Sequence, residues 1–244
     1  MRLVVSRRLA RIQGVEALLL LTAGFIAPQA QAARPMITDD ARITDAKACQ
    51  LESWVKNNRG STEYWALPAC NFTGNLELTL GGTRTRESGG AWTTDAVVQG
   101  KTLFKHLDPN GWGIGLVAGT VRHLQQQGDT GRNDWYAYVP ASFSFRDDAF
   151  VMHTNLGWQR EGETRRDGLT WGLGTETRLA ENTWLIAETF GQNRGKPFYQ
   201  FGLRHWLIPN RVQLDATYGN RNGSSSQERW FSIGLRLLSE QFLP

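Results

Sequence analysis

Apolar and polar residues alternate with a period of two on both sides of a polar, glycine-containing loop in residues 149–180. One face carries Phe150, Met152, Leu156 and Trp158 before the loop, and Leu169, Trp171, Leu173 and Leu179 after it. This alternation predicts a β-hairpin. Each arm has about ten residues, which is the length of a strand that crosses a bilayer at a tilt.

The same unit recurs along the chain, with no helical stretch of convincing length between the repeats. The pattern predicts twelve strands, at residues 47–57, 61–71, 75–86, 91–104, 112–124, 134–146, 149–160, 168–179, 183–192, 197–207, 211–220 and 228–238. The alternation is ambiguous in 47–71 and in 183–192, so the register of those strands stays open.

The connections between these strands alternate in length. Short turns are expected near residues 71–74, 106–111, 147–148, 180–182 and 209–210. Longer polar loops are expected near 58–60, 87–90, 125–133, 161–167, 193–196 and 221–227. Short turns on one side and long loops on the other are typical of outer-membrane barrels, and an even strand number leaves both termini on the periplasmic side.

Aromatic residues gather near both ends of the expected strands. The long-loop ends carry Trp92, Trp135, Trp158, Trp171 and Trp230, and the short-turn ends carry Trp112, Trp184, Trp206, Phe104, Phe145 and Phe150. Two bands of this kind predict the aromatic girdles that mark the two interfaces of a bilayer.

Together these patterns predict an all-β fold, a single antiparallel, up-and-down transmembrane β-barrel of about twelve strands within residues 47–244. Closure matters because an unpaired backbone N–H or C=O costs several kcal/mol in hydrocarbon, so an open sheet edge is not tolerated there. The alternative is a soluble periplasmic sandwich or lipocalin-like barrel, in which the apolar faces would point inward.

Two segments precede the barrel. Residues 1–32 combine a basic start, a short apolar run and an A-x-A site, which predicts a secretory signal peptide cleaved after Ala32. Residues 33–46 form a polar, aspartate-rich lead without a clear period, which is expected in the periplasm.

Cleavage of the signal peptide removes four of the 27 Lys and Arg residues and one of the 23 Asp and Glu residues. The mature chain then has 23 basic and 22 acidic residues. No basic patch remains, which argues against nucleic acid as a partner. We expect the outer membrane as location and its lipid as partner.

The two cysteines, Cys49 and Cys70, are expected to pair because export leads to an oxidising compartment. If residues 47–71 form a hairpin centred on residues 59–60, the residue numbers of any two paired positions add up to 119. The numbers 49 and 70 also add up to 119. The two cysteines would then lie directly opposite each other, at a spacing that a disulfide spans. Two unpaired thiols are the alternative.

Parts of the sequence resemble a known group of exported proteins. Residues 34–42 read RPMITDDAR, 49–52 read CQLE, 63–71 read EYWALPACN, and the end reads GLRLL at 234–238 and FLP at 242–244. These segments resemble outer-membrane barrels labelled as a phenol meta-pathway or transporter family. The resemblance implies a barrel and uptake of small or aromatic compounds, without naming a substrate or catalytic residues. The chain departs from outer-membrane barrels in ending at Pro244 rather than at an aromatic residue, so Phe242 is the candidate signal for the barrel-assembly machinery.

The inward face is expected to collect charge of both signs. By strand phase, the lumen-lining residues are Glu77, Asp95, Lys101, His153, Glu176, Arg178, Glu188, Arg204, Asp215 and Arg236, joined by Gln99, Asn155, Gln200 and Gln213. Such groups set the solute preference of a channel. Alternatively, they form a structural network of ion pairs that fills a narrow lumen. Inward glycines such as Gly172 and Gly174 are expected to relieve crowding.

Catalytic and metal sites find little support. None of the four histidines, His106, His123, His153 and His205, has a serine in a suitable phase nearby. No two histidines have a ligand spacing, and residues 111–115, GWGIG, lack the helix and glycine spacing of a dinucleotide fingerprint. We therefore expect no enzyme, no metal and no cofactor.

The sequence favours a channel or uptake protein for small solutes, aromatic ones among them. The alternatives are a closed barrel with a structural or partner-binding role and a lipid-modifying barrel enzyme.

Overall fold

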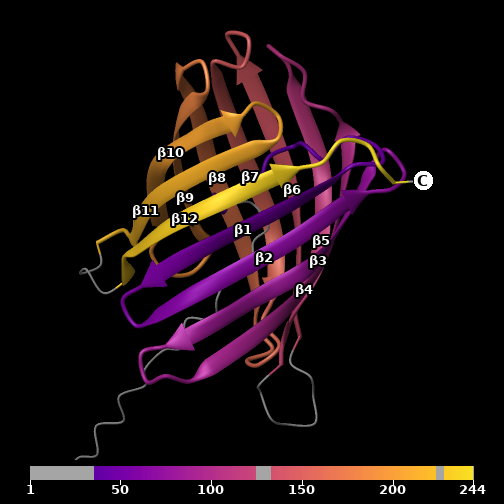
Figure 1. Cartoon of the computed structure of the whole chain (residues 1–244). Coiled ribbons are helices and arrows are strands. Elements are labelled where there is room, and N and C mark those ends of the chain that lie inside the picture. Colours follow the sequence, from indigo (N-terminus) through magenta and orange to yellow (C-terminus); the bar gives the residue numbers. More distant parts are fainter. Residues whose placement is uncertain (1–35, 125–132, 224–227, 244) are drawn as a thin grey trace, which may run out of the picture.

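The alternating segments of the sequence form strands that close on one another (Figure 1). The computed structural model describes residues 36–124, 133–223 and 228–243. Its strands are β1 (Cys49–Asn58), β2 (Ser61–Asn71), β3 (Leu76–Glu87), β4 (Trp92–Lys105), β5 (Trp112–His123), β6 (Asn133–Phe145), β7 (Phe150–Arg160), β8 (Asp167–Ala180), β9 (Thr183–Gln192), β10 (Phe198–Ile208), β11 (Val212–Arg221) and β12 (Trp230–Leu238).

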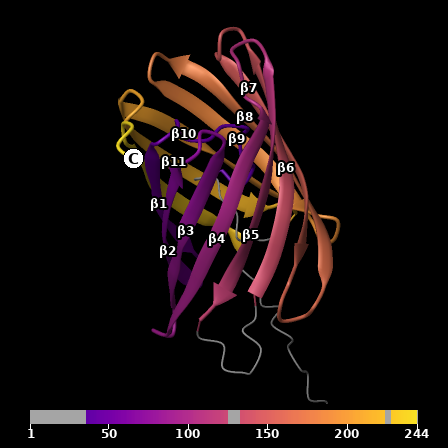
Figure 2. The same ribbon diagram turned by 90° about the vertical axis from the view of Figure 1, so that its right-hand side faces the viewer.

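Each strand pairs antiparallel with its neighbours in the sequence, and β1 pairs with β12 to complete the ring. The prediction of a closed, twelve-stranded, all-antiparallel barrel is therefore confirmed. Figure 2 shows the strands tilted along its wall, as closure of a sheet requires. The predicted signal peptide, and parts of the loops expected near 125–133 and 221–227, lie outside the described residues.

The outer face of the barrel is apolar. Leu80 in the middle of β3 is 62% exposed and Leu156 in β7 is 67% exposed, while their neighbours Thr79 and Asn155 point inward. Because the apolar faces point outward, the soluble alternative with an apolar interior is wrong. A surface of this kind is what lipid contacts in membrane barrels.

Most of the expected girdle residues lie on this outer face. Trp92, Trp135, Trp158 and Trp171 are exposed at the long-loop end, and Phe104, Trp112 and Phe145 are exposed at the short-turn end. The prediction is wrong for Trp230, which is 7% exposed and points inward, and for Trp184 and Trp206, which are half-buried in the inward phase of Ile186 and Arg204. Trp230 shares the strand phase of the inward Ser232, and Gly219 on β11 leaves room for its ring.

The first hairpin is covalently closed at its base. Cys49 and Cys70 are direct partners in the register of β1 and β2, with a Cα–Cα distance of 4.0 Å, and they form a disulfide. The predicted pairing is confirmed, and with it the register of this hairpin. The disulfide holds the start of β1 at the short-turn end of the barrel, beside the C-terminal segment, where Phe242 N–H donates to Lys47 O.

Candidate functional site

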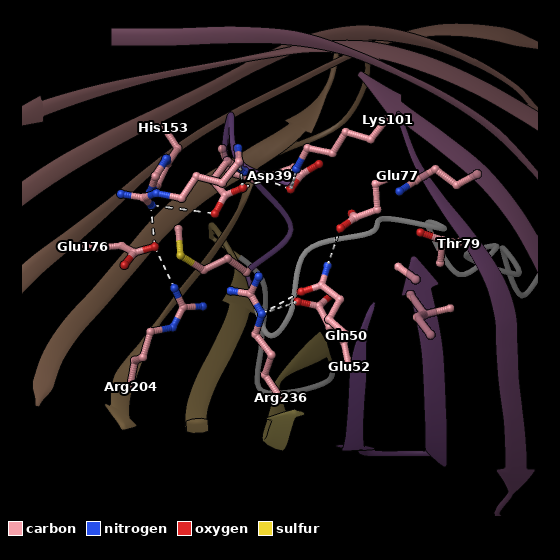
Figure 3. Close-up of a pocket in the computed structure, with 17 residues that line it drawn as sticks. Asp39, Gln50, Glu52, Glu77, Thr79, Lys101, His153, Glu176, Arg204 and Arg236 are labelled. Carbon is pink, nitrogen blue, oxygen red and sulfur yellow. Dashed lines mark hydrogen bonds and ion pairs between the residues drawn. The ribbon is translucent and has the colours of Figure 1, made fainter. Parts of the chain in front are cut away.

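The part of the predicted periplasmic lead that spans residues 36–44 lies inside the barrel, not outside it as expected. Met36, Thr38 and Ala41 are 3%, 2% and 0% exposed. The chain runs from the short-turn end, where Ala46 lies against Gly74, into the lumen, where Met36 lies against Gly174 in the middle of β8. Figure 3 shows this segment among side chains that converge on it from strands all around the wall. We call residues 36–44 the plug.

The plug is fixed to the wall where it enters. Lys47 N–H donates to Asn71 O over 2.7 Å, and the Asn71 side-chain amide donates to Thr44 O over 2.8 Å. The Thr44 N–H and hydroxyl both donate to Glu77 Oε2, each over 2.9 Å. The first strands therefore hold the base of the plug through hydrogen bonds to its backbone and to one threonine.

Asp39 is bound in the middle of the plug, through both its backbone and its carboxylate. Asp39 N–H donates to Asn155 Oδ1 over 2.7 Å, and Asn155 Nδ2 donates back to Asp39 O over 2.8 Å. The carboxylate accepts from Lys101 Nζ over 2.9 Å and from the Tyr138 hydroxyl over 3.0 Å. Lys101 also lies 3.3 Å from Asp40 Oδ1, so one buried cation binds two plug carboxylates.

Glu188 on β9 binds the inner end of the plug. The N–H groups of Ile37 and Thr38 donate to its two carboxylate oxygens, each over 2.6 Å. The neighbouring strand β8 makes room through two glycines, one of which, Gly174, is the register partner of Glu188. A Cβ on Gly172 would lie 2.5 Å from Thr38 Oγ1, and one on Gly174 would lie 2.4 Å from Met36 Cε. These glycines relieve crowding, as expected, and what they accommodate is the plug.

A chain of buried polar groups joins the plug to the far wall. Ala41 N–H donates to Ser142 Oγ over 2.8 Å, and Ser142 Oγ lies 2.8 Å from His153 Nδ1. His153 Nε2 lies 3.2 Å from Glu176 Oε1. Arg204 bridges Glu176 and Asp215 through contacts of 2.6 and 2.8 Å. This chain supports the network interpretation of the lumen charges.

The expectation that no histidine has a suitable serine is wrong, because Ser142 and His153 are direct partners across β6 and β7. A serine, a histidine and an acid in this order resemble a nucleophile and its base. Ser142 is 0% exposed, however, and its oxygen already accepts from the plug. With the plug in place this oxygen is covered, so in the closed state the arrangement holds the plug.

The remaining predicted lumen residues divide between the plug region and the two ends. Arg236 lies 2.8 Å from Gln50 Oε1 and 3.6 Å from Glu52, near the plug. Asp95 lies 2.7 Å from His123 toward the long-loop end of the barrel. Arg178 is exposed at the short-turn end, where it donates to Asp147 O and contacts the Trp184 ring.

The space left beside the plug is small. The cavity between plug and wall, lined by Glu77, Lys101, His153, Glu176, Arg204 and Arg236 among others, has a volume of about 40 Å³ (Figure 3). That volume holds only a few waters. Among the described residues, no cluster of three or more His, Cys, Asp or Glu is arranged to bind a metal ion.

Aromatic rings line the long-loop half of the lumen, which the sequence analysis did not predict. Trp54 stacks on Trp65 with ring centroids 5.0 Å apart, and Phe190 stacks on Phe198 at 5.5 Å. Lys56 Nζ lies 4.9 Å from the centre of the Trp230 ring. This half of the lumen therefore combines flat apolar faces with charge, whereas the plug region is polar.

The chain is similar to known families and structures over most of its length. A family model described as "Uncharacterised conserved protein UCP029691" matches residues 19–238. No curated protein matches the sequence. Among solved structures, the KdgM porin is 10% identical with a TM-score of 0.61, covering 77% of this chain and 98% of its own.

Two further structures have the same fold. The COG4313 outer membrane channel from Pseudomonas putida F1 is 11% identical with a TM-score of 0.55, covering 82% of this chain and 97% of its own. The NanC porin is 10% identical with a TM-score of 0.54, covering 78% and 98%. These matches support the barrel part of the resemblance drawn from the sequence, and none carries the phenol meta-pathway label.

Proposed function

The chain belongs to that family, and we propose that its barrel is an outer-membrane channel for small solutes that its own plug closes. The observation that carries the proposal is the plug itself, a short segment that leads into β1 and is bound to a charged lumen wall. The likeness in fold to porins and a channel supports the proposal.

The chemistry of the contacts favours a plug that leaves. Its described contacts with Glu77, Lys101, Asn155 and Glu188 are hydrogen bonds and ion pairs. When the plug leaves, water takes over these bonds, so the net contribution of each to closure is only about 0.5–1.5 kcal/mol, rising to about 3 for charged groups. A plug packed by large apolar side chains would lose far more on entering water.

The lumen wall also indicates which solutes fit. The plug region presents both signs of charge and many hydrogen-bonding groups, which suits small polar solutes. The stacked rings Trp54–Trp65 and Phe190–Phe198 add flat apolar faces toward the long-loop end, which suits solutes with an aromatic or ring portion. We propose that a solute contacts the rings first and the charged region second.

The same proposal places the protein in the outer membrane, after export directed by residues 1–32. The apolar outer face and the exposed rings at both ends provide the lipid contact. Phe242 is 65% exposed in the C-terminal segment, which suits a signal that the barrel-assembly machinery reads.

The test compares the full chain with a variant that lacks residues 36–44 in planar lipid bilayers. We expect the full chain to be closed most of the time and the deletion variant to conduct steadily. Heat-modifiable migration on gels shows whether each barrel is folded. A folded deletion variant that stays silent with small ions would reject the channel, and would favour a closed barrel with a structural role.

A further inference from the structure

We propose that the wall around residues 37–41 is a binding site for short acidic peptides supplied from outside the chain, and that the plug is its tethered occupant. The inference rests on the proposed function, because the site becomes accessible only when the plug leaves. It names the class of solute that the plug region takes: an extended peptide with a carboxylate side chain.

The wall recognises peptide backbone. Glu188 accepts from two consecutive N–H groups, those of Ile37 and Thr38. Asn155 both donates to and accepts from the backbone of Asp39, as a neighbouring strand would. Ser142 accepts from Ala41 N–H. These contacts require regularly spaced amide groups and do not depend on which side chains the peptide carries.

A second set of wall groups selects one acidic side chain. Lys101 and Tyr138 donate to different oxygens of the Asp39 carboxylate, over 2.9 and 3.0 Å. Lys101 is 4% exposed, so the pair is shielded from water and its interaction is stronger than at a surface. The glycines of β8 border Thr38, one residue before the acid, and a Cβ on Gly172 would lie 2.5 Å from its hydroxyl oxygen, so the wall fits closely around a threonine there.

The two sets together exclude simple dicarboxylic acids. A second carboxylate placed at Glu188 would meet a like charge, because Glu188 needs N–H donors rather than another acceptor. A sugar lacks the paired, evenly spaced amides that Asn155 and Glu188 bind. A peptide with an acidic residue two positions after its first bound N–H meets both demands.

The experiment uses the variant without residues 36–44 and an acetylated, amidated hexapeptide of the plug sequence, residues 37–42 (ITDDAR). Calorimetry in detergent measures binding, and planar bilayers measure block. We expect the peptide to bind and to reduce conductance, and we expect a peptide with Asn for both Asp to bind roughly tenfold to a hundredfold more weakly. Lys101→Met in the deletion background should weaken binding of the acidic peptide roughly a hundredfold to a few thousandfold, because it leaves the bound carboxylates without their cation. Lys105→Met, in the same strand but at the short-turn rim, is the matched control and should leave binding unchanged.

The outcomes separate the two proposals. If the deletion variant conducts but binds both peptides equally, or if Lys101→Met has no effect, the peptide site is wrong and the channel stands. If a linear dicarboxylate such as glutarate binds as tightly as the acidic peptide, recognition of the backbone is wrong. If the folded deletion variant is silent, the channel is wrong, and calorimetry still decides whether the peptide binds.

Discussion

Replacing Lys101 with methionine removes the cation on which both plug carboxylates converge, while keeping most of the side-chain length. The ammonium group lies 2.9 Å from Asp39 Oδ1 and 3.3 Å from Asp40 Oδ1, and Lys101 is 4% exposed with the plug in place. The substitution therefore acts on the closed state, in which the buried carboxylate of Asp39 and the half-buried one of Asp40 would lose this cation. In the open state, water solvates them.

The size of the effect follows from the fact that the substitution destabilises the closed state and not the open state. Removing one partner of a buried ion pair costs about 3–5 kcal/mol. Since each 1.4 kcal/mol is a factor of ten, the ratio of open to closed barrels should rise roughly a hundredfold to a few thousandfold. The deletion of residues 36–44 sets the upper limit, because no point substitution can open the lumen further than removal of the plug.

Single-channel recording in planar bilayers measures the open fraction directly. Lys105→Met is the matched control, since Lys105 lies at the rim of the same strand and pairs with the exposed Asp108. We expect the control to behave like the unaltered chain. An open fraction for Lys101→Met no greater than that of the control, in a barrel that still shows heat-modifiable migration, would refute the role of this ion pair in closure.

Three further substitutions test other parts of the structure. Gly172→Val places a Cβ 2.5 Å from Thr38 Oγ1 and should raise conductance by displacing the plug, whereas Gly168→Val, with its nearest contact at 3.5 Å, should not; equal currents would contradict the close fit. Replacing Cys49 and Cys70 together by serine opens a loop of sequence separation 21 and should lower the free energy of unfolding by about 3 kcal/mol, seen as a lower temperature of band conversion on gels; an unchanged temperature would argue against it. Leu80→Arg in mid-β3 should destabilise the barrel in vesicles by about 2–4 kcal/mol, against about 1 or less for Leu76→Arg at the strand's start; equal losses in urea titrations would argue against lipid contact at Leu80.

The sequence predicted the wall of this barrel better than its interior. Period-two alternation depends on local pleating, so it placed all twelve strands and their short turns. The disulfide followed from hairpin symmetry, because partners around a tight turn have a constant sum. The same arithmetic around the turn at 147–148 pairs Ser142 with His153, a pairing that strand phase alone does not reveal. Trp230 was misplaced because its position near a strand end was considered without its phase.

The position of the plug inside the barrel could not be predicted from sequence patterns of this kind. Residues 36–44 have no periodicity, and polarity alone favours water as much as a polar lumen. What holds the segment is a set of side chains far away in the sequence, such as Glu188, 151 residues after Ile37. Only the closed ring of strands brings these groups together, so the site is a property of the tertiary structure. For the same reason the stacking of Trp54 on Trp65, in the long-loop half of the lumen, could be recognised only from the register of β1 and β2.

The anchoring of Lys47 and Cys49 has a consequence for how much solute the barrel needs before it responds. Because the plug is covalently attached next to its own binding site, its effective concentration there is of the order of millimolar, as for other short linkers. A solute that competes with the plug must reach that concentration or bind more tightly, and its apparent affinity is its intrinsic affinity multiplied by the fraction of barrels whose plug has already left. Such a barrel would therefore stay closed at low solute concentration and admit the solute only at high concentration.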